Sequence, residues 1–488
     1  MSVHWPIIRS LVRNATRELV VDDKRGYKGA EILVAALHVA ELLEAKCASC
    51  TVGLLLPSSG ATPICALASW MLGKTVVPLN FLLKRDELQY VIDDCETDTI
   101  LTVQPMLDFL GYQPRVKNLF KLEDVNFKAV PQPRWPATAS DDDLALLLYT
   151  SGTSGLPKGV MLTHGNLRSN IEQVQEWIHF TTDEVMFGVL PQFHSFGMTV
   201  LTLLPLSVGL KVIYTARFVP HRIVRAIREQ RPTIAVFIPS MYNALLGVKD
   251  ARPEDFASLK FIVSGGEPLP EAVFRGFKDR FGVTINEGYG LTETAPATNW
   301  CRPSEWRPHS VGKPLPWLDQ IIVDVNTERV LGPNEDGEVR MKGPNIMKGY
   351  LKLPKETAAA FDARGYFRTG DLGRFDDEGH LYITGRLKEM MIIGGENVFP
   401  REIEEVLNKH PSVAASGVVG VMDPLRGEQP WAFVELREGQ SFDEQALFDA
   451  CRASLAGYKV PREIRRVDAL PRNGTGKIMR RELKKLVN

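Results

Sequence analysis

Short, continuous apolar runs alternate along the chain with longer segments in which apolar residues recur every three or four positions. The runs at residues 51–57, 233–240 and 260–264 have the length and composition of buried strands. The segments at residues 30–46 and 221–230 have the apolar spacing of one helix face. Strands that alternate with helices in this way predict helices layered on mostly parallel sheets. We therefore predict an α/β protein with layered sheets in a large N-terminal domain.

The pattern changes after about residue 385, where a segment of roughly a hundred residues begins. Within it, residues 400–410 and 443–455 have helical spacing, whereas residues 415–421 and 430–436 read as strands. We interpret this segment as a smaller α+β domain. The predicted domains are residues 1–387 and residues 388–488.

The composition is that of an ordinary globular protein, with 44% hydrophobic residues, 24% charged residues and a net charge of −1 over 488 residues. A charge so close to zero gives no reason to expect nucleic acid as a partner. The N-terminus lacks the uninterrupted apolar segment of a signal peptide. The most apolar long stretch, residues 196–214, contains Pro205, Gly209 and Lys211, so we predict core rather than a membrane span. We expect a cytoplasmic protein without a transmembrane segment.

The cysteines change this picture little. Six of them are scattered over the chain, which suits a reducing compartment. Cys47 and Cys50 form a C-x-x-C pair, but no second pair or Cys/His set follows at a metal-binding spacing. We expect ordinary thiols near a helix end.

The stretch "YTSGTSGLPKGV", residues 149–160, joins two predicted strands at residues 144–150 and 159–164. Glycines allow a backbone to turn its N–H groups toward an anion, and the hydroxyls and Lys158 add donors and positive charge. The loop therefore suits a polyphosphate. Gly152 and Lys158 have the separation of a P-loop, but Pro157 and Gly159 replace its second glycine and its Mg²⁺-binding hydroxyl. A P-loop kinase or NTPase is accordingly disfavoured.

Two further stretches carry candidate nucleotide contacts. In "INEGYGLTETAP", residues 285–296, Tyr289 offers an aromatic plane for a base, and Glu293 is a natural Mg²⁺ ligand near phosphates. A turn with a packed tyrosine is the structural alternative. In residues 366–386, Asp371 lies in a glycine-bounded turn where its carboxylate can accept ribose hydroxyls, and Arg386 ends a strand. Surface salt bridging is the alternative for both.

These elements, with "LPRNGTGKIMRREL" near the C-terminus, resemble in order the adenylate-forming superfamily of acyl-CoA synthetases, luciferases and peptide-synthetase adenylation domains. The resemblance covers nearly the whole chain and is closest to fatty acyl-CoA ligases. It implies a large N-terminal domain and a small mobile C-terminal domain, with Lys388 as the hinge between them. It also implies contacts with ATP and CoA by Thr150, Ser151, Gly152, Thr153, Ser154, Gly155, Lys158, Gly265, Gly266, Glu267, Gly288, Tyr289, Gly290, Thr292, Asp371, Arg386, Gly394, Gly395 and Glu396.

The chemistry that the resemblance implies has two steps. A carboxylate first attacks the α-phosphorus of ATP and expels pyrophosphate, and the thiol of CoA then attacks the acyl-adenylate and releases AMP. Lys477 is expected to bridge the two anionic reactants, while Mg²⁺ on Glu293 and the Thr150 hydroxyl neutralises phosphate charge. Because these residues are all present, a non-catalytic nucleotide-binding module is disfavoured.

The acid is indicated by "LPQFHSFGMTV", where His194 follows Phe193. In amino-acid-activating relatives an aspartate usually stands at this place, so the histidine argues for an uncharged acyl tail. A core imidazole is the structural alternative for His194, and the apolar residues around it are equally compatible with mere core. We predict a medium- to long-chain fatty acid, with aryl acids second.

The acceptor is predicted from the C-terminal segment. "MMIIGGENVFPREIEEVL" and residues 457–464 resemble segments that serve CoA in the relatives. The basic C-terminus can attract the phosphates of CoA, but also an acidic acyl carrier protein. We therefore predict CoA as the acceptor and keep a carrier protein as the second candidate.

Overall fold

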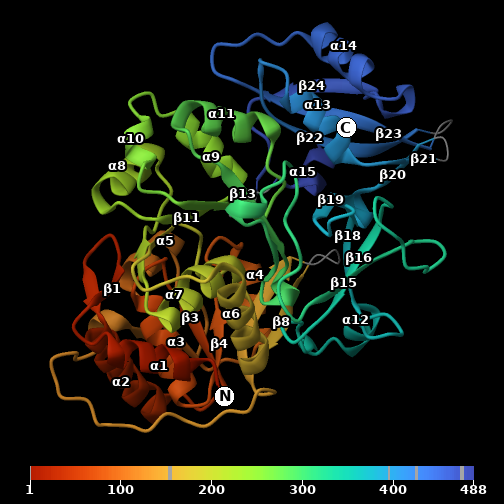
Figure 1. Ribbon diagram of the computed structural model, residues 1–488. Coiled ribbons are helices and arrows are strands. Elements are labelled where there is room, and N and C mark those ends of the chain that lie inside the picture. The colour runs from red at the N-terminus through yellow and green to blue at the C-terminus, as the bar shows by residue number, and fades with distance from the viewer. Residues whose placement is uncertain (1, 152–155, 394–395, 424–426, 473–477, 488) are drawn as a thin grey trace.

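The computed structural model describes residues 2–151, 156–393, 396–423, 427–472 and 478–487. The predicted α/β class is confirmed: a large N-terminal part contains layered sheets, and a smaller part with its own sheet follows (Figure 1). Gly152, Thr153, Ser154, Gly155, Gly394, Gly395 and Lys477 lie outside the described residues.

The first sheet has the strand order β14-β13-β12-β11-β9-β10-β1-β2. Neighbours from β13 to β1 are parallel, whereas the edge strands β14 and β2 are antiparallel to their neighbours. The strands are β1 (Glu18–Val21), β2 (Gly26–Lys28), β9 (Val185–Gly188), β10 (Lys211–Tyr214), β11 (Ile234–Phe237), β12 (Phe261–Ser264), β13 (Ile285–Gly290) and β14 (Ala297–Trp300).

The second sheet has the order β17-β8-β7-β4-β3-β5-β6. It is parallel from β7 to β6, and β8 and β17 add two antiparallel strands at one edge. The strands are β3 (Thr51–Leu55), β4 (Thr75–Pro78), β5 (Thr99–Thr102), β6 (Asn118–Lys121), β7 (Leu144–Ser151), β8 (Pro157–Thr163) and β17 (Gly349–Tyr350).

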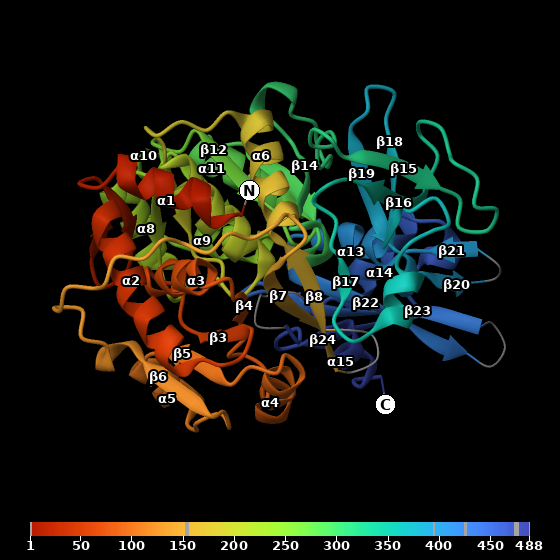
Figure 2. The same ribbon diagram turned by 90° about the horizontal axis from the view of Figure 1, so that it is seen from below.

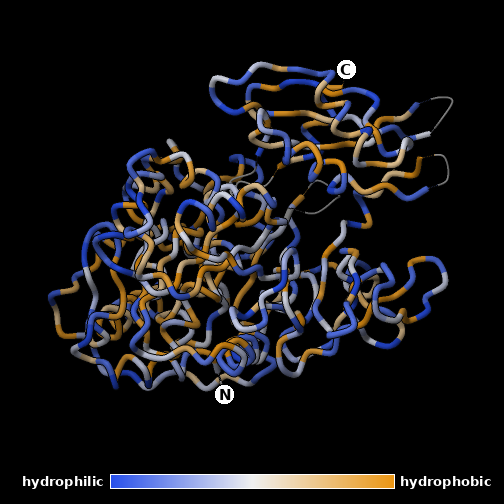
Figure 3. Tube along the Cα trace, turned by 45° about the horizontal axis from the view of Figure 1, so that its top comes forward, coloured by the Kyte–Doolittle hydropathy of each residue, from blue (hydrophilic) through white to orange (hydrophobic). Residues whose placement is uncertain are grey.

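Helices cover both faces of these sheets, because the strands are apolar on both sides. Val212 points into the core shared by the two sheets, while its neighbour Ile213 packs under helices on the outer face. The shared core is built with α1 (His4–Arg13), α2 (Gly29–Lys46), α3 (Ala61–Met71), α6 (His164–Ile178) and α7 (Leu204–Val208). The outer layers contain α8 (Pro220–Gln230), α9 (Pro239–Leu246), α10 (Pro253–Phe256) and α11 (Glu271–Phe281) on the first sheet, and α4 (Arg85–Asp94) and α5 (Gln104–Leu110) on the second. Figure 3 shows the hydrophobic positions gathered inside these layers.

A third sheet, β15-β16-β18-β19, lies beside these layers and next to the C-terminal part (Figures 1 and 2). Its strands are antiparallel: β15 (Asp319–Val323), β16 (Gly337–Lys342), β18 (Phe367–Phe375) and β19 (Leu381–Arg386), with α12 (Pro354–Ala359) between β16 and β18 in the sequence. Short 3-10 turns connect elements at η1 (Leu122–Asp124), η3 (Thr292–Thr294), η4 (Pro303–Glu305), η5 (Leu387–Glu389) and η6 (Gly457–Lys459).

The C-terminal part has the strand order β21-β20-β23-β22, with β24 parallel to β23. Its elements are β20 (Met391–Ile393), β21 (Glu396–Val398), α13 (Pro400–Asn408), β22 (Val413–Asp423), β23 (Gly427–Leu436), α14 (Glu444–Ser454), β24 (Glu463–Val467) and α15 (Arg480–Lys484). The helices predicted at residues 400–410 and 443–455 and the strands predicted at 415–421 and 430–436 are therefore confirmed. The predicted domain boundary before Lys388 falls within η5 and stays a prediction.

The apolar stretch from residue 196 to residue 214 is core, as predicted. It forms η2 (Phe196–Leu203), a π-helix, followed by α7 and β10, and its side chains are mostly buried. Among the described residues, no helix is long and apolar enough to cross a membrane. All six cysteines lie in the described part of the chain as free thiols, and Cys47 and Cys50 directly follow α2.

Candidate functional site

The stem of the predicted phosphate loop is an antiparallel hairpin of β7 and β8. Thr150 lies opposite Lys158, and Ser151 lies opposite Pro157. The ammonium group of Lys158 lies over the ring of Tyr350, 5.4 Å from its centroid, a distance that allows a cation–π contact. The hairpin therefore brings Thr150 and Lys158 to the same edge of the second sheet.

Tyr350 connects this hairpin to Glu293. Its strand β17 pairs with β8, and its hydroxyl donates to Oε1 of Glu293 over 3.0 Å. Burial raises the pKa of the Glu293 carboxyl, while hydrogen bonds from its own backbone and from the Tyr350 hydroxyl oppose this change. Glu293 is thus held near Lys158 by a tyrosine.

The donor set around Glu293 fits Mg²⁺. The described residues contain no group of three histidine, cysteine or acidic side chains that could form a closed metal cage. Mg²⁺ in nucleotide sites is usually bound by one or two carboxylates together with phosphate oxygens and water. The single carboxylate of Glu293 and the Thr150 hydroxyl are therefore a suitable protein contribution.

The predicted ribose pair is brought together by the third sheet. Asp371 in β18 lies opposite Arg386 in β19, and Nε of Arg386 is 2.7 Å from Oδ1 of Asp371. The Tyr289 hydroxyl donates to Oδ2 of the same carboxylate over 2.7 Å. Asp371 is 2% exposed, so its orientation is fixed by two donors before any ligand binds. The attraction to Asp371 raises the pKa of the Arg386 guanidinium, which stays charged.

The strand ends of the first sheet supply the predicted adenine border. Gly265, Gly266 and Glu267 follow β12, whose last residue Ser264 lies beside Glu287 in β13. Gly288, Tyr289 and Gly290 end β13. A side chain at Gly290 would collide with the Pro296 carbonyl oxygen, 1.9 Å from the position of a Cβ atom. Only glycine allows this close approach. The motifs therefore meet at the carboxyl ends of neighbouring parallel strands.

His194 is exposed and lies two residues before the first residue of the π-helix η2. The alternative of a core imidazole is thus wrong. Nδ1 of His194 accepts a hydrogen bond from the Phe196 N–H over 3.3 Å, and the Phe196 ring fills the space beside Gly265. His194 therefore lies close to the adenine border. Thr292 is joined to the same region because its hydroxyl is 3.3 Å from the Ser195 hydroxyl.

Lys388 is exposed within η5, between β19 and the C-terminal sheet. The next residue, Glu389, pairs with Arg480 at 3.0 Å, and Arg480 also contacts both carboxylate oxygens of Glu404 in α13. Arg480 begins α15, three residues after Lys477. The turn η5 and the start of α15 are therefore held together.

Two described parts of the C-terminal region, α15 and the strands β20 and β21, lie on different sides of it. A hydrogen bond from Lys485 lowers the pKa of Glu482 in α15, and the charge of Lys84 at the start of α4 acts in the same direction, so α15 lies near the N-terminal part. The strands β20 and β21 point to the outer edge of the molecule, away from β8, in both Figure 1 and Figure 2. Glu396, which begins β21, is exposed.

A buried carboxylate, Glu287, marks the contact between the two parts. Burial raises the pKa of its carboxyl to about 7, with the charge of Arg401 in α13 opposing this change. The guanidinium group of Arg401 also donates to the carbonyl oxygen of Ile383 in β19. The C-terminal part therefore lies beside β13, the strand that also contains Tyr289.

Sequence reasoning missed Tyr350, Ser195 and the charged residues behind Asp371. Tyr350 lies 57 positions after Glu293, and no local pattern marks it as the partner of that carboxylate. Ser195 lies in the segment of residues 190–200 that contains His194, but only the fold places its hydroxyl beside Thr292.

Known proteins resemble this chain over nearly its whole length. Residues 9–351 match the family model described as AMP-binding enzyme, and residues 402–477 match the one described as AMP-binding enzyme C-terminal domain. A long-chain-fatty-acid–CoA ligase of Bacillus subtilis is 32% identical, covering 88% of this chain and 84% of its own. A 2-succinylbenzoate–CoA ligase of Bacillus licheniformis is 35% identical, covering 89% of each chain.

Solved structures show the same fold. The crystal structure of ATP-bound MatB from Rhodopseudomonas palustris has a TM-score of 0.90 at 29% identity, over 100% of this chain and 99% of its own. The apo form of that protein, over the same shares, has a TM-score of 0.80.

Proposed function

Because this chain belongs to the AMP-binding enzyme family, as an ATP-using acid–CoA ligase, we propose that its acid substrate is a medium- to long-chain fatty acid. The curated relatives act on acids as different as long-chain fatty acids and 2-succinylbenzoate, so the family alone leaves the acid open.

The observation that carries the proposal is the uncharged, mostly apolar composition of the segment that follows His194, up to Leu203. Residues 189–204 contain no carboxylate that could pair with a substrate amine, and exposed His194 stands where the segment meets the adenine border. Behind it, η2 is apolar and buried from Gly197 to Leu203. Such surroundings favour an uncharged tail, since burial of an unpaired ammonium group is costly.

In the first half-reaction, we propose that the Asp371 carboxylate accepts hydrogen bonds from the ribose hydroxyls of ATP, while Tyr289 and Arg386 keep that carboxylate oriented. The β7–β8 hairpin with Lys158 would hold the phosphates of ATP. Mg²⁺ bound by Glu293 would supply positive charge to those phosphates. Lys477 would hold the acid carboxylate against the α-phosphate, so that two anionic reactants meet in the productive geometry.

In the second half-reaction, the thiol of CoA attacks the acyl carbonyl and AMP leaves. We propose that the C-terminal domain, residues 388–488, rotates about Lys388 and brings the segment with Gly394, Gly395 and Glu396 toward the nucleotide. The present arrangement, with α15 near α4 and with β20–β21 turned away, is the one we assign to the first half-reaction. The higher TM-score to ATP-bound than to apo MatB supports this assignment.

One alternative acid and one alternative acyl acceptor each have an observation in their favour. An aryl acid is favoured by the 35% identity to a 2-succinylbenzoate–CoA ligase. An acidic acyl carrier protein as acceptor is favoured by the basic side chains Arg481 and Lys484 in the last turn of α15. Cytoplasmic localisation stays a prediction.

The proposal is tested by acid-dependent exchange of radioactive pyrophosphate into ATP. Dodecanoate, palmitate, benzoate, 2-succinylbenzoate and several amino acids are compared at equal concentration, with Glu293→Gln as the inactive control. We expect a fatty acid to give the highest kcat/KM, and CoA to exceed a pantetheinylated carrier protein as acceptor. An amino acid as best substrate would overturn the role given to His194, and no exchange with any acid would overturn the proposed function.

A further inference from the structure

Asp371 does not lie in a regular strand but in a bulge of β18. On the neighbouring strand β16, Glu338 lies opposite Leu372 and Arg340 lies opposite Arg368. One residue separates the pair on β16, whereas three residues, 369–371, separate the pair on β18. A bulge of this kind turns a side chain out of its regular direction and frees backbone groups from the ladder.

The freed backbone groups of the bulge are bound by side chains. The Gly370 N–H donates to Oε1 of Glu338 over 3.2 Å, and Gly370 has a φ of 67°, in the left-handed region that favours glycine. The Asp371 N–H donates to the Thr369 hydroxyl over 3.0 Å, and that hydroxyl donates to the Val339 carbonyl over 2.6 Å. Glu338 thus takes the place that a ladder carbonyl would have.

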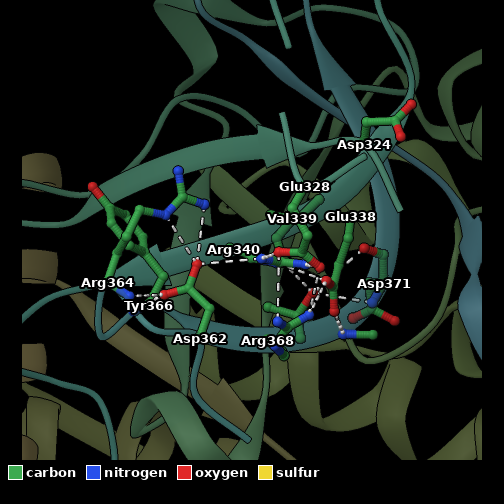
Figure 4. A network of polar contacts seen from close by, with 12 residues as sticks. Asp324, Glu328, Glu338, Val339, Arg340, Asp362, Arg364, Tyr366, Arg368 and Asp371 are labelled. Carbon is green, nitrogen blue, oxygen red and sulfur yellow. Dashed lines mark hydrogen bonds and ion pairs between the residues drawn. The ribbon is translucent and has the colours of Figure 1, made fainter. Parts of the chain in front are cut away.

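Glu338 is in turn held by Arg340, two positions further along the same face of β16. Nε of Arg340 donates to Oε2 of Glu338 over 2.7 Å, and the two residues are 1% and 4% exposed. A carboxylate buried without a cation would be costly. The ion pair with Arg340, supported by Nη1 of Arg368 at 3.7 Å from Oε2, is what allows Glu338 to stand behind the bulge. Figure 4 shows Arg340 at the centre of the network, between Asp362 and Glu328.

The remaining partners fix the guanidinium group of Arg340. Nη1 lies 3.2 Å from Oδ2 of Asp362, and Nη2 lies 2.9 Å from Oε1 of Glu328. Arg340 also stands directly across from Arg368, a like-charged pair that would be unfavourable alone. The Glu328 carboxylate contacts both arginines and removes this conflict. Hydrogen bonds to Glu328 raise the pKa of Arg340, which stays charged.

We propose that Glu338 is a positioning residue for the ribose-binding carboxylate, and that Arg340 holds it in place. The bulge fixes the backbone of Asp371 from the β16 side, while Arg386 and Tyr289 hold its carboxylate from the other side. The chain of contacts therefore runs from Arg340 through Glu338 and Gly370 to Asp371. The inference rests on the proposed function, because it takes Asp371 as the residue that binds the ribose hydroxyls.

The test compares ATP with 2′,3′-dideoxyATP in pyrophosphate exchange. A hydrogen bond to a charged group corresponds to roughly a tenfold to hundredfold effect, so we expect wild-type kcat/KM to favour ATP by about 10². In Glu338→Gln the amide faces two donors, the Gly370 N–H and Arg340, and can satisfy only one of them. In this variant, we expect the ratio of kcat/KM for ATP to kcat/KM for 2′,3′-dideoxyATP to fall by about tenfold. KM for ATP should rise by a larger factor than kcat falls.

The matched control is Arg374→Met, because Arg374 lies on the same strand but pairs with Asp336 at the surface, 3.0 Å away. This control should keep the wild-type ratio. A merely structural effect of Glu338→Gln would lower the rates with both nucleotides in proportion and leave the ratio unchanged. If Glu338→Gln does not fold, Arg340→Lys carries the test with an expected loss of about threefold, since a lysine keeps the charge but not the fork of donors.

A ratio within twofold of wild type in the folded variant would overturn the inference, as would a wild-type enzyme that does not distinguish the two nucleotides. Calorimetric binding of ATP and 2′,3′-dideoxyATP to the same variants separates this result from a failure of the proposed function. It needs no acid, so a preference that disappears in Glu338→Gln would support the inference even for an enzyme whose acid is not among those tested.

Discussion

At the residue scale, single polar contacts orient the charged side chains of the proposed nucleotide site. The resemblance of the motif around Glu293 to the adenylate-forming superfamily predicts that residue as a metal ligand. Its partner Tyr350 could not be predicted, because the two residues meet only through the pairing of β17 with β8. The same holds for Glu338 and Arg340, whose roles follow from a bulge that no sequence pattern marks.

Tyr350→Phe tests the coupling between these residues. Burial raises the pKa of Glu293 and the Tyr350 hydroxyl lowers it, so the variant should have a higher Glu293 pKa than wild type. The ionised carboxylate is the form that binds Mg²⁺. At pH values below the Glu293 pKa of the variant, we therefore expect Tyr350→Phe to exchange pyrophosphate roughly tenfold more slowly than wild type. At alkaline pH the rates should converge. The pH–rate profile decides this, and an acid limb at the same pH in both enzymes would contradict it.

Glu287→Gln tests the buried carboxyl at the domain contact. Its pKa of about 7 in the folded protein lies above the ordinary value of 4.5, so the folded state binds the proton more tightly. The contribution of Glu287 to stability is therefore fully present below pH 4.5 and is lost as the pH rises through 7. We expect the glutamine variant not to show this loss, which amounts to on the order of 3 kcal/mol.

Denaturant unfolding of both proteins between pH 5 and pH 8 provides the measurement. The difference in the free energy of unfolding should shift in favour of Glu287→Gln as the pH rises. Parallel curves for the two proteins would show that Glu287 ionises at its ordinary pKa.

Secondary-structure elements were the most predictable part of this molecule. The predicted helices at residues 30–46 and 221–230 correspond to α2 and α8. α8 has a clear apolar face, whereas α2 is apolar over most of its surface and buries Ile32, Ala36, Val39 and Leu43 at helical spacing. The strands around the phosphate loop are β7 and β8, as expected. Apolar spacing does not reveal a π-helix such as η2, nor the order of strands in a sheet, since both depend on contacts between distant segments.

The hinge is an element-scale prediction that rests on the resemblance and on the position of η5. Lys388→Pro would fix φ near −65° and remove one N–H, which would tend to hold one domain orientation. We expect the variant to keep much of its acyl-adenylate formation and to lose most of its thioester formation. Lys388→Ala, with an unrestricted backbone, is the matched control and should behave like wild type.

The two half-reactions are measured separately, with pyrophosphate exchange for the first and synthetic acyl-adenylate plus CoA for the second. Unimpaired transfer to CoA by Lys388→Pro would remove the hinge assignment.

At the scale of the whole molecule, the arrangement of the two parts connects the elements into one site. Phe399 of the C-terminal part packs against Gly385 in β19, where a Cβ atom would be 2.9 Å from its ring. Arg480 joins α15 to η5 and α13. The sequence alone indicated both domains and their motifs, but not the contacts of Phe399 and Arg480, because these connect segments that are distant in the sequence.

Lys477→Ala should separate the two half-reactions. Loss of a preorganised cation typically lowers a rate by roughly 10²–10³, and we expect this loss in pyrophosphate exchange. Transfer from synthetic acyl-adenylate to CoA should fall far less, since the proposed rotation removes this lysine from the site. Equal losses in both assays would contradict the separation of roles.

The π-helix η2 has a consequence for the evolution of acid choice. A π-helix is an α-helix with one extra residue per turn, and it is followed here by the α-helix α7. Loss of one residue within η2 could be absorbed by a return of the segment to α-helical i→i+4 hydrogen bonds, so α7 and β10 would keep their places. We expect such a deletion to change which side chains of η2 lie beside His194 and to leave the β7–β8 hairpin in place.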